Sequence, residues 1–497
     1  MSSSSLAGTA RRLAGNVAAA VTGSSPRVQA VLLLTLALPQ LYLLPEGSLD
    51  VALSTFVTVL LLAGVLLRAV RAPGRPLAHL GLLGVLAALL AVRILAVAWS
   101  PDPRAGMQPV AILGQFVVAL MVMSAALRED PKLLTYVQRL YWPWVVAEAC
   151  LVVVFRFLPG VEDAFLRSIG GVFVGQNTAA ALFGDGRNNV LDVAKAGGVF
   201  VNANVAAMFL GVNGLAALAV FAVTRARWVA AVGVTALVAV PFTGSKSATV
   251  LAFTLPALAL GAYQMTRSVM PARRRYLLLG ALAAGSGAIL AALIVNTGLR
   301  NAMVEAFVGR MVIWGFGAQS FRHSPILGLG YGGWDAGFPL YAAEHGLYKS
   351  FPPHNVLLAA WSTTGIAGLV LTLGFFALLV RLVVRGLSGR AAIDRKFVAF
   401  AGAAIAWTFI QGMGENTDIF GEIHLIPVLA LLLVHLIQPI GEEATGNATQ
   451  AYRRRRATPA IPAVGDVHPQ PGDGAAPLPA AVRGEGPGPD HAGSRLG

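Results

Sequence analysis

Long apolar segments recur along most of this chain, and they constrain its fold more than any other feature of the sequence. Runs near or above 18 residues are long enough to cross the hydrocarbon layer of a bilayer as helices. Of the 497 residues, 56% are hydrophobic and only 12% are charged. That charged fraction is about half of what soluble domains usually carry. The sequence therefore predicts an all-α polytopic membrane protein.

The apolar runs predict about twelve transmembrane helices. The first run follows a polar segment with two arginines and has no clear cleavage site, so we expect a retained helix and not a signal peptide. The end of the chain is rich in Pro, Gly, Ala and Arg, which is typical of a disordered tail. The chain thus divides into a cytoplasmic segment 1–27, a transmembrane domain 28–440 and a disordered cytoplasmic tail 441–497. The predicted spans are 28–44, 51–70, 77–98, 109–127, 136–158, 198–222, 228–242, 246–264, 276–295, 355–380, 397–413 and 421–439.

Basic residues collect on one side of these predicted spans. Cytoplasmic connections of membrane proteins carry an excess of Lys and Arg, so we expect both termini in the cytoplasm. The formal net charge of +14 follows from this topology, and no nucleic-acid partner is expected. The residues concerned are Arg11, Arg12, Arg27, Arg68, Arg71, Arg75, Arg128, Lys132, Arg225, Arg227, Arg267, Arg273, Arg274, Arg275, Arg381, Arg385, Arg390, Arg395, Lys396 and Arg453 to Arg456.

Two long extracytoplasmic loops are predicted on the opposite side, at 159–197 and 296–354, the second just before the tenth span. Long connections of this kind are usually functional. In the second, apolar residues recur at helical spacing. This predicts an amphipathic helix, lying along the outer membrane surface or packed on the helix bundle. The residues are Leu299, Met303, Phe307, Met311, Trp314, Ala318 and Phe321.

The stretch PPHNVLLAAWSTTGIAG at 352–368 places His354 behind two prolines at the outer end of the tenth span. A lone histidine at a membrane interface is often only an interfacial or capping group. Other cations, however, lie on the same side, where they are normally scarce. Together these groups are suited to bind a phosphate-bearing lipid head group through charge-assisted hydrogen bonds. They are Lys195, Lys246, Arg310, Arg322, His323, His345 and Lys349.

The remaining motifs give little support to other chemistries. The G-x-G-x-x-G match at 328–333 lies in an outer loop, where we expect a glycine-rich turn and no nucleotide. No HExxH pair, cysteine pair or Walker A sequence occurs, so no metal or cofactor is expected. Arg93 and Glu148 lie within apolar spans, where ionisable groups either serve function or pair with opposite charges. Asn202 and Asn204 are candidates for hydrogen bonds between helices.

The region from His354 to Gly368 resembles the signature of the O-antigen ligase and O-antigen polymerase superfamily. That signature is His, then Asn, Ser or Gln, nine residues, Gly, two residues and Gly. Here it is met by His354, Asn355, Gly365 and Gly368. It also stands where the family has it, after the large outer loop. The similarity covers about 28–440 and leaves out the tail.

Three further blocks resemble patterns of the same family. The first has an Arg, a Trp four residues later, then a proline and G-x-G. The second is a Gly-Thr-Phe…Asn-Pro-Asn…Ala block, and the third is a Thr…Ser-Arg block before a span. The corresponding segments are 309–334 with Arg310 and Trp314, 197–209 with Asn202 and Asn204, and 243–251 with Lys246.

The chain departs from the family pattern at two cations. Lys246 stands where the third of these blocks has Arg, and Lys195 stands where an Arg precedes the second. The Asn-Pro-Asn triplet is Asn202-Ala203-Asn204 here. Lysine cannot form the two-pronged contact that arginine makes with phosphate, so we expect the grip on a pyrophosphate to differ.

The resemblance implies a GT-C-like O-antigen ligase fold in the bacterial inner membrane. It implies an inverting, metal-independent transfer of a glycan from an undecaprenyl-pyrophosphate carrier, among membrane lipids, to an acceptor hydroxyl on the outer face. The acceptor is lipid A-core in a ligase and another lipid-linked glycan in an O-antigen or exopolysaccharide polymerase. His354 would be the base, while Arg310, Lys246 and Lys195 would hold the pyrophosphate. The supporting residues would be Asn355, which orients His354, and Trp314, Asn202, Asn204, Gly365 and Gly368.

Two other classes compete with this interpretation: a secondary transporter and a purely structural membrane scaffold. A twelve-span transporter is expected to have inverted repeats and ionisable residues at mid-membrane. No internal repeat is evident, and the polar groups gather at the outer ends of the predicted spans. The outer cations also argue against a scaffold.

Overall fold

A computed structural model describes most of the chain between Pro26 and Ile437. The terminal regions predicted at 1–27 and 441–497 lie almost entirely outside the described residues, as does much of the spans predicted at 28–44 and 51–70. The ninth predicted span, 276–295, is described only in part. The stretches not described are 1–25, 35–56, 65–79, 171–193, 348–350, 390–391, 438–497 and parts of 130–138 and 267–296.

Helices account for the regular structure in the described part of the chain, where the one β-type pairing is an isolated bridge between Asp418 and Gly421. This agrees with the all-α class predicted from the apolar runs. The main helices are α2 (Pro26–Leu34), α4 (Leu80–Ala96), α5 (Met107–Glu129), α7 (Trp142–Phe157), α8 (Pro159–Phe165), α11 (Ala203–Thr224), α12 (Arg227–Ala239), α13 (Lys246–Met265), α15 (Thr297–His323), α16 (Gly333–Glu344), α17 (Val356–Gly389), α18 (Ala392–Gly412) and α19 (Ile426–Ile437).

Several of these helices are long and apolar enough to cross a membrane. Within the described residues there are 5, and the pair formed by α7 and the helix that follows it would make a sixth. That pair bends by 119° at Leu158, immediately before Pro159, because proline cannot continue the hydrogen bonding of the preceding helix. The described helices support a multi-pass membrane protein, and the number twelve remains a prediction. The 5 are Gly81–Trp99, Pro103–Arg128, Ala203–Thr224, Lys246–Met265 and Val356–Gly389.

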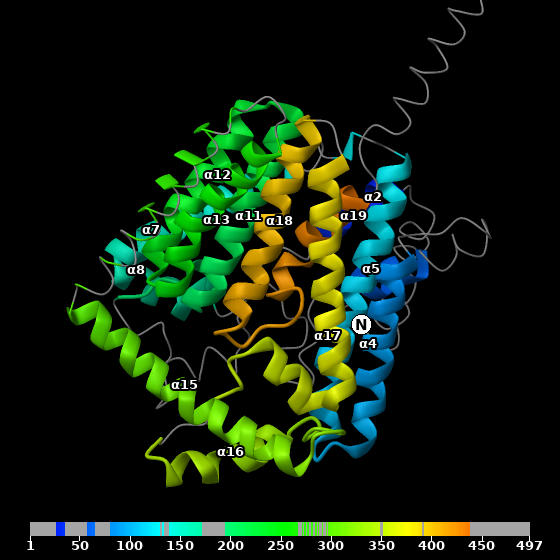
Figure 1. Cartoon of the computed structure of the whole chain (residues 1–497), viewed down its shortest axis with the longest axis vertical. Coiled ribbons are helices and arrows are strands. Elements are labelled where there is room, and N and C mark those ends of the chain that lie inside the picture. The colour runs from blue at the N-terminus through cyan, green and yellow to red at the C-terminus, as the bar shows by residue number, and fades with distance from the viewer. Residues whose placement is uncertain are drawn as a thin grey trace, which may run out of the picture. The chain divides into compact units, whose positions relative to one another are not determined.

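The helix α11 forms the centre of the bundle, where it packs against α12, α13 and α18 (Figure 1). It is apolar on all sides and buried over nearly its whole length, as expected of a helix surrounded by other helices. Gly211 of α11 lies directly against the indole of Trp407 on α18, so that any Cβ at 211 would overlap the ring. A small residue therefore allows the two backbones to approach closely.

The helices α15 and α16 lie across one end of the bundle (Figure 1). The helix predicted from the spacing of apolar residues 299–321 is confirmed as α15, Thr297–His323. Most of the 296–354 segment is thus helical and not an extended loop. A separate apolar core holds α15 and α16 together, with Ile313, Phe316, Trp334, Phe338 and Ala342 buried in it.

Candidate functional site

His354 lies immediately before α17, in a backbone conformation that few residues adopt. Its φ is 46°, in the left-handed region. The next residue, Asn355, begins the helix: its Oδ1 accepts hydrogen bonds from the backbone N–H groups of Leu357 at 2.9 Å and Leu358 at 3.1 Å. Backbone strain of this kind persists only where surrounding contacts hold it, and it concentrates at functional sites. Asn355 thus fixes the helix start from which His354 projects.

The carboxylate of Glu415 lies between the side chains of His354 and Arg310. The His354 Nδ1 atom is 4.0 Å from Oε2 of Glu415, and the Arg310 Nη2 atom is 3.5 Å from Oε1. Arg310 also donates to the backbone carbonyl of Gly414 through Nε at 3.2 Å and Nη2 at 2.8 Å. The arginine therefore connects α15 to the segment that follows α18, and it brings a positive charge next to the histidine.

Burial and charge set the protonation states of this cluster. Burial, assisted by the neighbouring charge of Arg310, lowers the pKa of His354 below its ordinary 6.5. Burial raises the pKa of Glu415 to about 6, against the opposing effects of Arg310, a hydrogen bond with Asn204 and the charge of Lys195. At neutral pH the imidazole is consequently neutral and able to accept a proton, while the carboxylate is largely ionised.

A cavity of about 230 Å³ opens beside His354 and Glu415. Its walls come from the start of α11, the end of α18 and the segments that precede α17 and α19. The Nδ1 atom of His354 is buried and has no hydrogen-bond partner within the described part of the chain. The polar residues that line the cavity are Asn202, Asn204, His354, Gln411, Glu415, Asn416, Thr417 and Glu422.

The two asparagines at the start of α11 have different positions in this site. Asn202 is the N-cap of α11, and its side chain accepts a hydrogen bond from the backbone N–H of Asn204 at 2.9 Å. Asn204 bonds to the Glu415 side chain, and its carbonyl accepts a hydrogen bond from Gln411 of α18 at 3.0 Å. Asn204 therefore links two helices at the cavity, whereas Asn202 caps the start of α11.

Two buried carboxyl groups hold the segment that leads into α11. The backbone N–H of Gly197 donates to Glu162 at 3.4 Å, and that of Val199 donates to Glu148 at 3.2 Å. Gly198 contacts the Glu148 carboxyl so closely that a Cβ would overlap it. Glu148, a charged residue in an apolar span, thus anchors the backbone between Lys195 and Asn202.

The structure brings Lys195 into the electrostatic environment of the site, through its effect on Glu415. The backbone beside it is fixed by a hydrogen bond from Ala196 N–H to the carbonyl of Thr243 at 3.0 Å. Lys246 is exposed in the first turn of α13, shortly after that contact. No ion pair or hydrogen bond recorded for the described residues joins Lys246 to Glu415 or His354.

Gly365 is the point at which α17 is interrupted. Its φ of 70° and ψ of −163° are not helical, and a Cβ there would overlap the carbonyl oxygen of Ile326. The interruption frees backbone groups: Ile366 N–H donates to Ile326 at 3.0 Å, and Ser362 accepts from Leu329 N–H at 2.7 Å. Gly365 therefore docks the segment 326–330 against α17. Gly368 lies one turn further on, against the Thr364 side chain, in a buried position.

The glycine-rich sequence 328–333 is this docked segment. Gly328, Gly330 and Gly332 all have positive φ, which confirms the turn predicted there. The backbone N–H of Tyr331 donates to Ser100 Oγ at 2.7 Å, and its carbonyl accepts from Asp102 N–H at 3.0 Å. The glycines thus bring the turn against the connection between α4 and α5.

Trp314 lies away from the cavity lining. It packs with the apolar core between α15 and α16, and its ring meets Phe307 edge-on at 6.4 Å between ring centroids. Its position one turn after Arg310 on α15 indicates a structural role in seating the arginine's helix.

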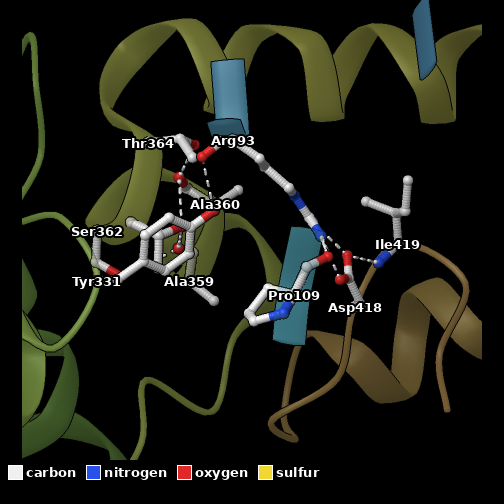
Figure 2. Close-up of polar contacts among 10 residues, drawn as sticks. Arg93, Pro109, Tyr331, Ala359, Ala360, Ser362, Thr364, Asp418 and Ile419 are labelled. Atoms are coloured by element: carbon white, nitrogen blue, oxygen red, sulfur yellow. Dashed lines mark hydrogen bonds and ion pairs between the residues drawn. The ribbon is translucent and has the colours of Figure 1, made fainter. Parts of the chain in front are cut away.

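Glu415 is the residue of the cluster that the sequence did not single out. An acidic residue in a short connection between predicted spans is ordinary, and only the fold places it between His354 and Arg310. Arg93, by contrast, has the structural role considered for it: its guanidinium pairs with both carboxylate oxygens of Asp418, at 2.7 and 2.6 Å (Figure 2).

Residues 196–373 match the family model described as O-antigen ligase. The matched segment runs from the 197–204 block through Arg310 to the His354 signature and its two glycines. Comparison with curated protein sequences gives no match. This segment is therefore similar to the O-antigen ligase family, and the described apolar helices support a multi-pass membrane protein.

Proposed function

We propose that this protein transfers a glycan from an undecaprenyl-pyrophosphate carrier to a sugar hydroxyl on the outer face of the bacterial inner membrane. The observation that carries the proposal is the arrangement of His354 and Arg310 around the carboxylate of Glu415 beside a cavity. A neutral imidazole and a cation side by side are the two groups that this transfer needs. We also propose that both termini lie in the cytoplasm, on the side where the basic connections are predicted.

In the proposed reaction the acceptor hydroxyl attacks the anomeric carbon of the donor sugar. Its proton passes to the neutral imidazole of His354 as the new C–O bond forms. The bond between the anomeric carbon and the pyrophosphate oxygen breaks, and undecaprenyl pyrophosphate leaves with the bonding electron pair. Direct attack inverts the anomeric configuration. The pyrophosphate already activates the sugar, so the proposed step requires neither a metal nor a nucleotide.

Cations are required because negative charge grows on the leaving pyrophosphate. Arg310 is held by two hydrogen bonds to Gly414, next to Glu415, which lines the cavity. Lys195 acts on the same Glu415 carboxylate, and Lys246 follows the segment packed against the backbone of Lys195. We assign pyrophosphate binding to all three, with Arg310 as the principal contact. The two lysines would act as point charges, since they lack the planar fork of arginine.

The Glu415 carboxylate would stabilise the positive charge that His354 acquires when it takes the proton. A carboxylate beside a histidine base favours the imidazolium that forms and restrains the ring's orientation. At 4.0 Å between Nδ1 and Oε2, a small rotation of either side chain would make the hydrogen bond. Asn355 and the interruption at Gly365 would hold the helix start that carries the histidine.

The acceptor decides between the two activities in the superfamily. Lipid A-core as acceptor would make the protein a ligase, and a second lipid-linked glycan would make it an O-antigen or exopolysaccharide polymerase. Both reactions use the same base and the same leaving group, so the site fits either one.

A transfer assay in nanodiscs tests the proposal and separates the two activities. The purified protein would receive a lipid-pyrophosphate-linked glycan, with and without lipid A-core. One product on lipid A-core would identify a ligase, and a ladder of longer lipid-linked chains without it would identify a polymerase. Absence of transfer to either acceptor, with a donor shown to bind, would contradict the proposal and favour a transporter.

A further inference from the structure

A second and larger cavity, of about 420 Å³, lies next to the one beside His354. Asn416, Thr417 and Glu422 line both cavities, so the segment 416–422 contacts both of them. The other walls of the larger cavity are the end of α4, the start of α5, Tyr331 and the first two turns of α17. The volume lies in the range of small-molecule binding sites.

The charges around the larger cavity are balanced against one another and do not favour an anion. Arg93 uses its guanidinium on Asp418, and Nη1 also donates to the Pro109 carbonyl at 3.2 Å (Figure 2). Among the described residues, Arg93 is the only cation in the lining, and Glu422 adds a second carboxyl group. The one cation of this lining within the described residues is already paired, so the lining does not favour a pyrophosphate.

The remaining polar groups in the lining are neutral. The amides of Gln108 and Asn416 are exposed, and neither makes a hydrogen bond to another described residue. The hydroxyl of Thr417 is buried without a partner in the described part of the chain. Apolar surface from Ile112 and Ala360 stands beside these groups. Such a wall offers several unused donors and acceptors next to carbon–hydrogen surface.

We propose that the larger cavity is a subsite for an uncharged pyranose, while the pyrophosphate binds beside His354 and Arg310. A pyranose has hydroxyl groups that both donate and accept, together with apolar faces, which matches amides, hydroxyls and apolar walls in one cavity. The inference rests on the proposed transfer reaction and specifies where a sugar is held. The sugar belongs either to the donor or to the acceptor, and the segment 416–422 is the part of the protein that contacts both subsites.

Ligand-observed NMR on the full protein in nanodiscs tests the subsite without any need for transfer. The probes are a panel of uncharged methyl pyranosides at millimolar concentration, followed by saturation transfer, and inorganic pyrophosphate, followed by ³¹P line broadening. We expect Q108A to remove most of the pyranoside signal and to leave pyrophosphate broadening unchanged. Asn416 lines both cavities, so for N416A only the loss of the pyranoside signal is used. R310A should remove most of the pyrophosphate broadening and leave the pyranoside signal unchanged. Gln319 is exposed on α15 and lines neither cavity, so Q319A is the matched control.

The outcomes separate this inference from the proposed function. Pyranoside signals that persist in both cavity variants, or that are absent from the wild type for the whole panel, would overturn the subsite. Loss of pyrophosphate broadening in Q108A would overturn the assignment of sugar and pyrophosphate to two separate cavities. Wild-type protein that binds pyranosides at this cavity but fails to broaden pyrophosphate would support the subsite and count against the proposed function.

Kinetics of transfer then identify which sugar is held. A rise of about tenfold in the KM for the acceptor alone, with kcat and the donor KM unchanged, would assign the subsite to the acceptor. The same rise in the donor KM alone would assign it to the donor. Unchanged values of both KM in Q108A and N416A would overturn the inference.

Discussion

The Nδ1 atom of His354 lies 4.0 Å from Oε2 of Glu415. The other carboxylate oxygen of Glu415 lies 3.5 Å from Arg310. One carboxylate thus stands between a histidine suited to accept a proton and an arginine suited to hold a leaving group. These residues are 44 or more positions apart in the sequence and come from three different segments at one end of the bundle.

Removal of the Glu415 charge should slow transfer more than it weakens donor binding. In E415Q the imidazolium loses the carboxylate that stabilises it, so we expect kcat to fall roughly 10- to 100-fold, a part of what a general base contributes. The donor KM should change by a smaller factor than kcat. Glu344 is exposed on α16, and E344Q is the matched control. Equal kcat values for E415Q and the wild type would remove Glu415 from the mechanism.

Replacement of Arg310, even by lysine, should weaken binding of the donor. Lysine retains the charge but cannot make the paired Nε and Nη2 contacts with Gly414 that hold the arginine in place. We expect R310K to raise the donor KM by about 10- to 100-fold, the cost of one charged hydrogen bond. Arg322 is exposed on the same helix, so R322K should behave as wild type. A normal donor KM in R310K would show that Arg310 does not contact the pyrophosphate.

The pH dependence of kcat/KM should show an acid limb below the ordinary histidine pKa. Burial and Arg310 both lower the pKa of His354 from 6.5, so the imidazole stays neutral, and active, to a lower pH than a free histidine. Activity should therefore be nearly constant above 6.5 and fall below it, where Glu415, whose pKa burial raises to about 6, also takes up a proton. R310Q removes the positive neighbour and should move the limb to higher pH. An acid limb well above 6.5 in the wild type, or a shift to lower pH in R310Q, would contradict this assignment.

Two glycines of α17 provide a matched pair for stability. At Gly365 an added Cβ would overlap the carbonyl of Ile326 and also meet an unfavourable φ, so G365A should cost about 2–4 kcal/mol of unfolding free energy. Gly374 has no atom within 4 Å of such a Cβ, and G374A should stabilise the helix by about 0.5–1 kcal/mol. Thermal unfolding in detergent compares the two. Indistinguishable Tm values would show that the contact of segment 326–330 with Gly365 does not contribute to the stability of the protein.

The sequence was informative wherever a single segment determines its own structure. Apolar runs long enough to span a bilayer indicated the membrane helices, helical spacing indicated α15, and three glycines indicated the turn at 328–333. The sequence does not predict the bend before Pro159, because the residues after it are typical of a loop, whereas the structure has α8 there. The segment was polar enough to interrupt the apolar pattern, and the pattern does not say in which direction a helix turns back.

Pairings between distant segments were beyond the sequence for a different reason. Glu415 is one of several acidic residues in short connections predicted on the outer side, and nothing in its neighbourhood indicates Arg310 or His354 as partners. The sequence likewise does not indicate which residue pairs with Arg93, and the structure shows that it is Asp418. Tertiary packing decides these contacts, so one-dimensional spacing identifies the candidate groups but does not pair them.

The central claim is that His354 accepts the acceptor's proton, and the variant H354N tests it most directly. Asparagine tolerates the left-handed backbone at this position better than most residues, so the protein should insert, fold and broaden pyrophosphate as the wild type does. We expect kcat for glycan transfer in nanodiscs to fall by about 10²- to 10⁴-fold. Wild-type kcat in a folded, pyrophosphate-binding H354N protein would contradict it.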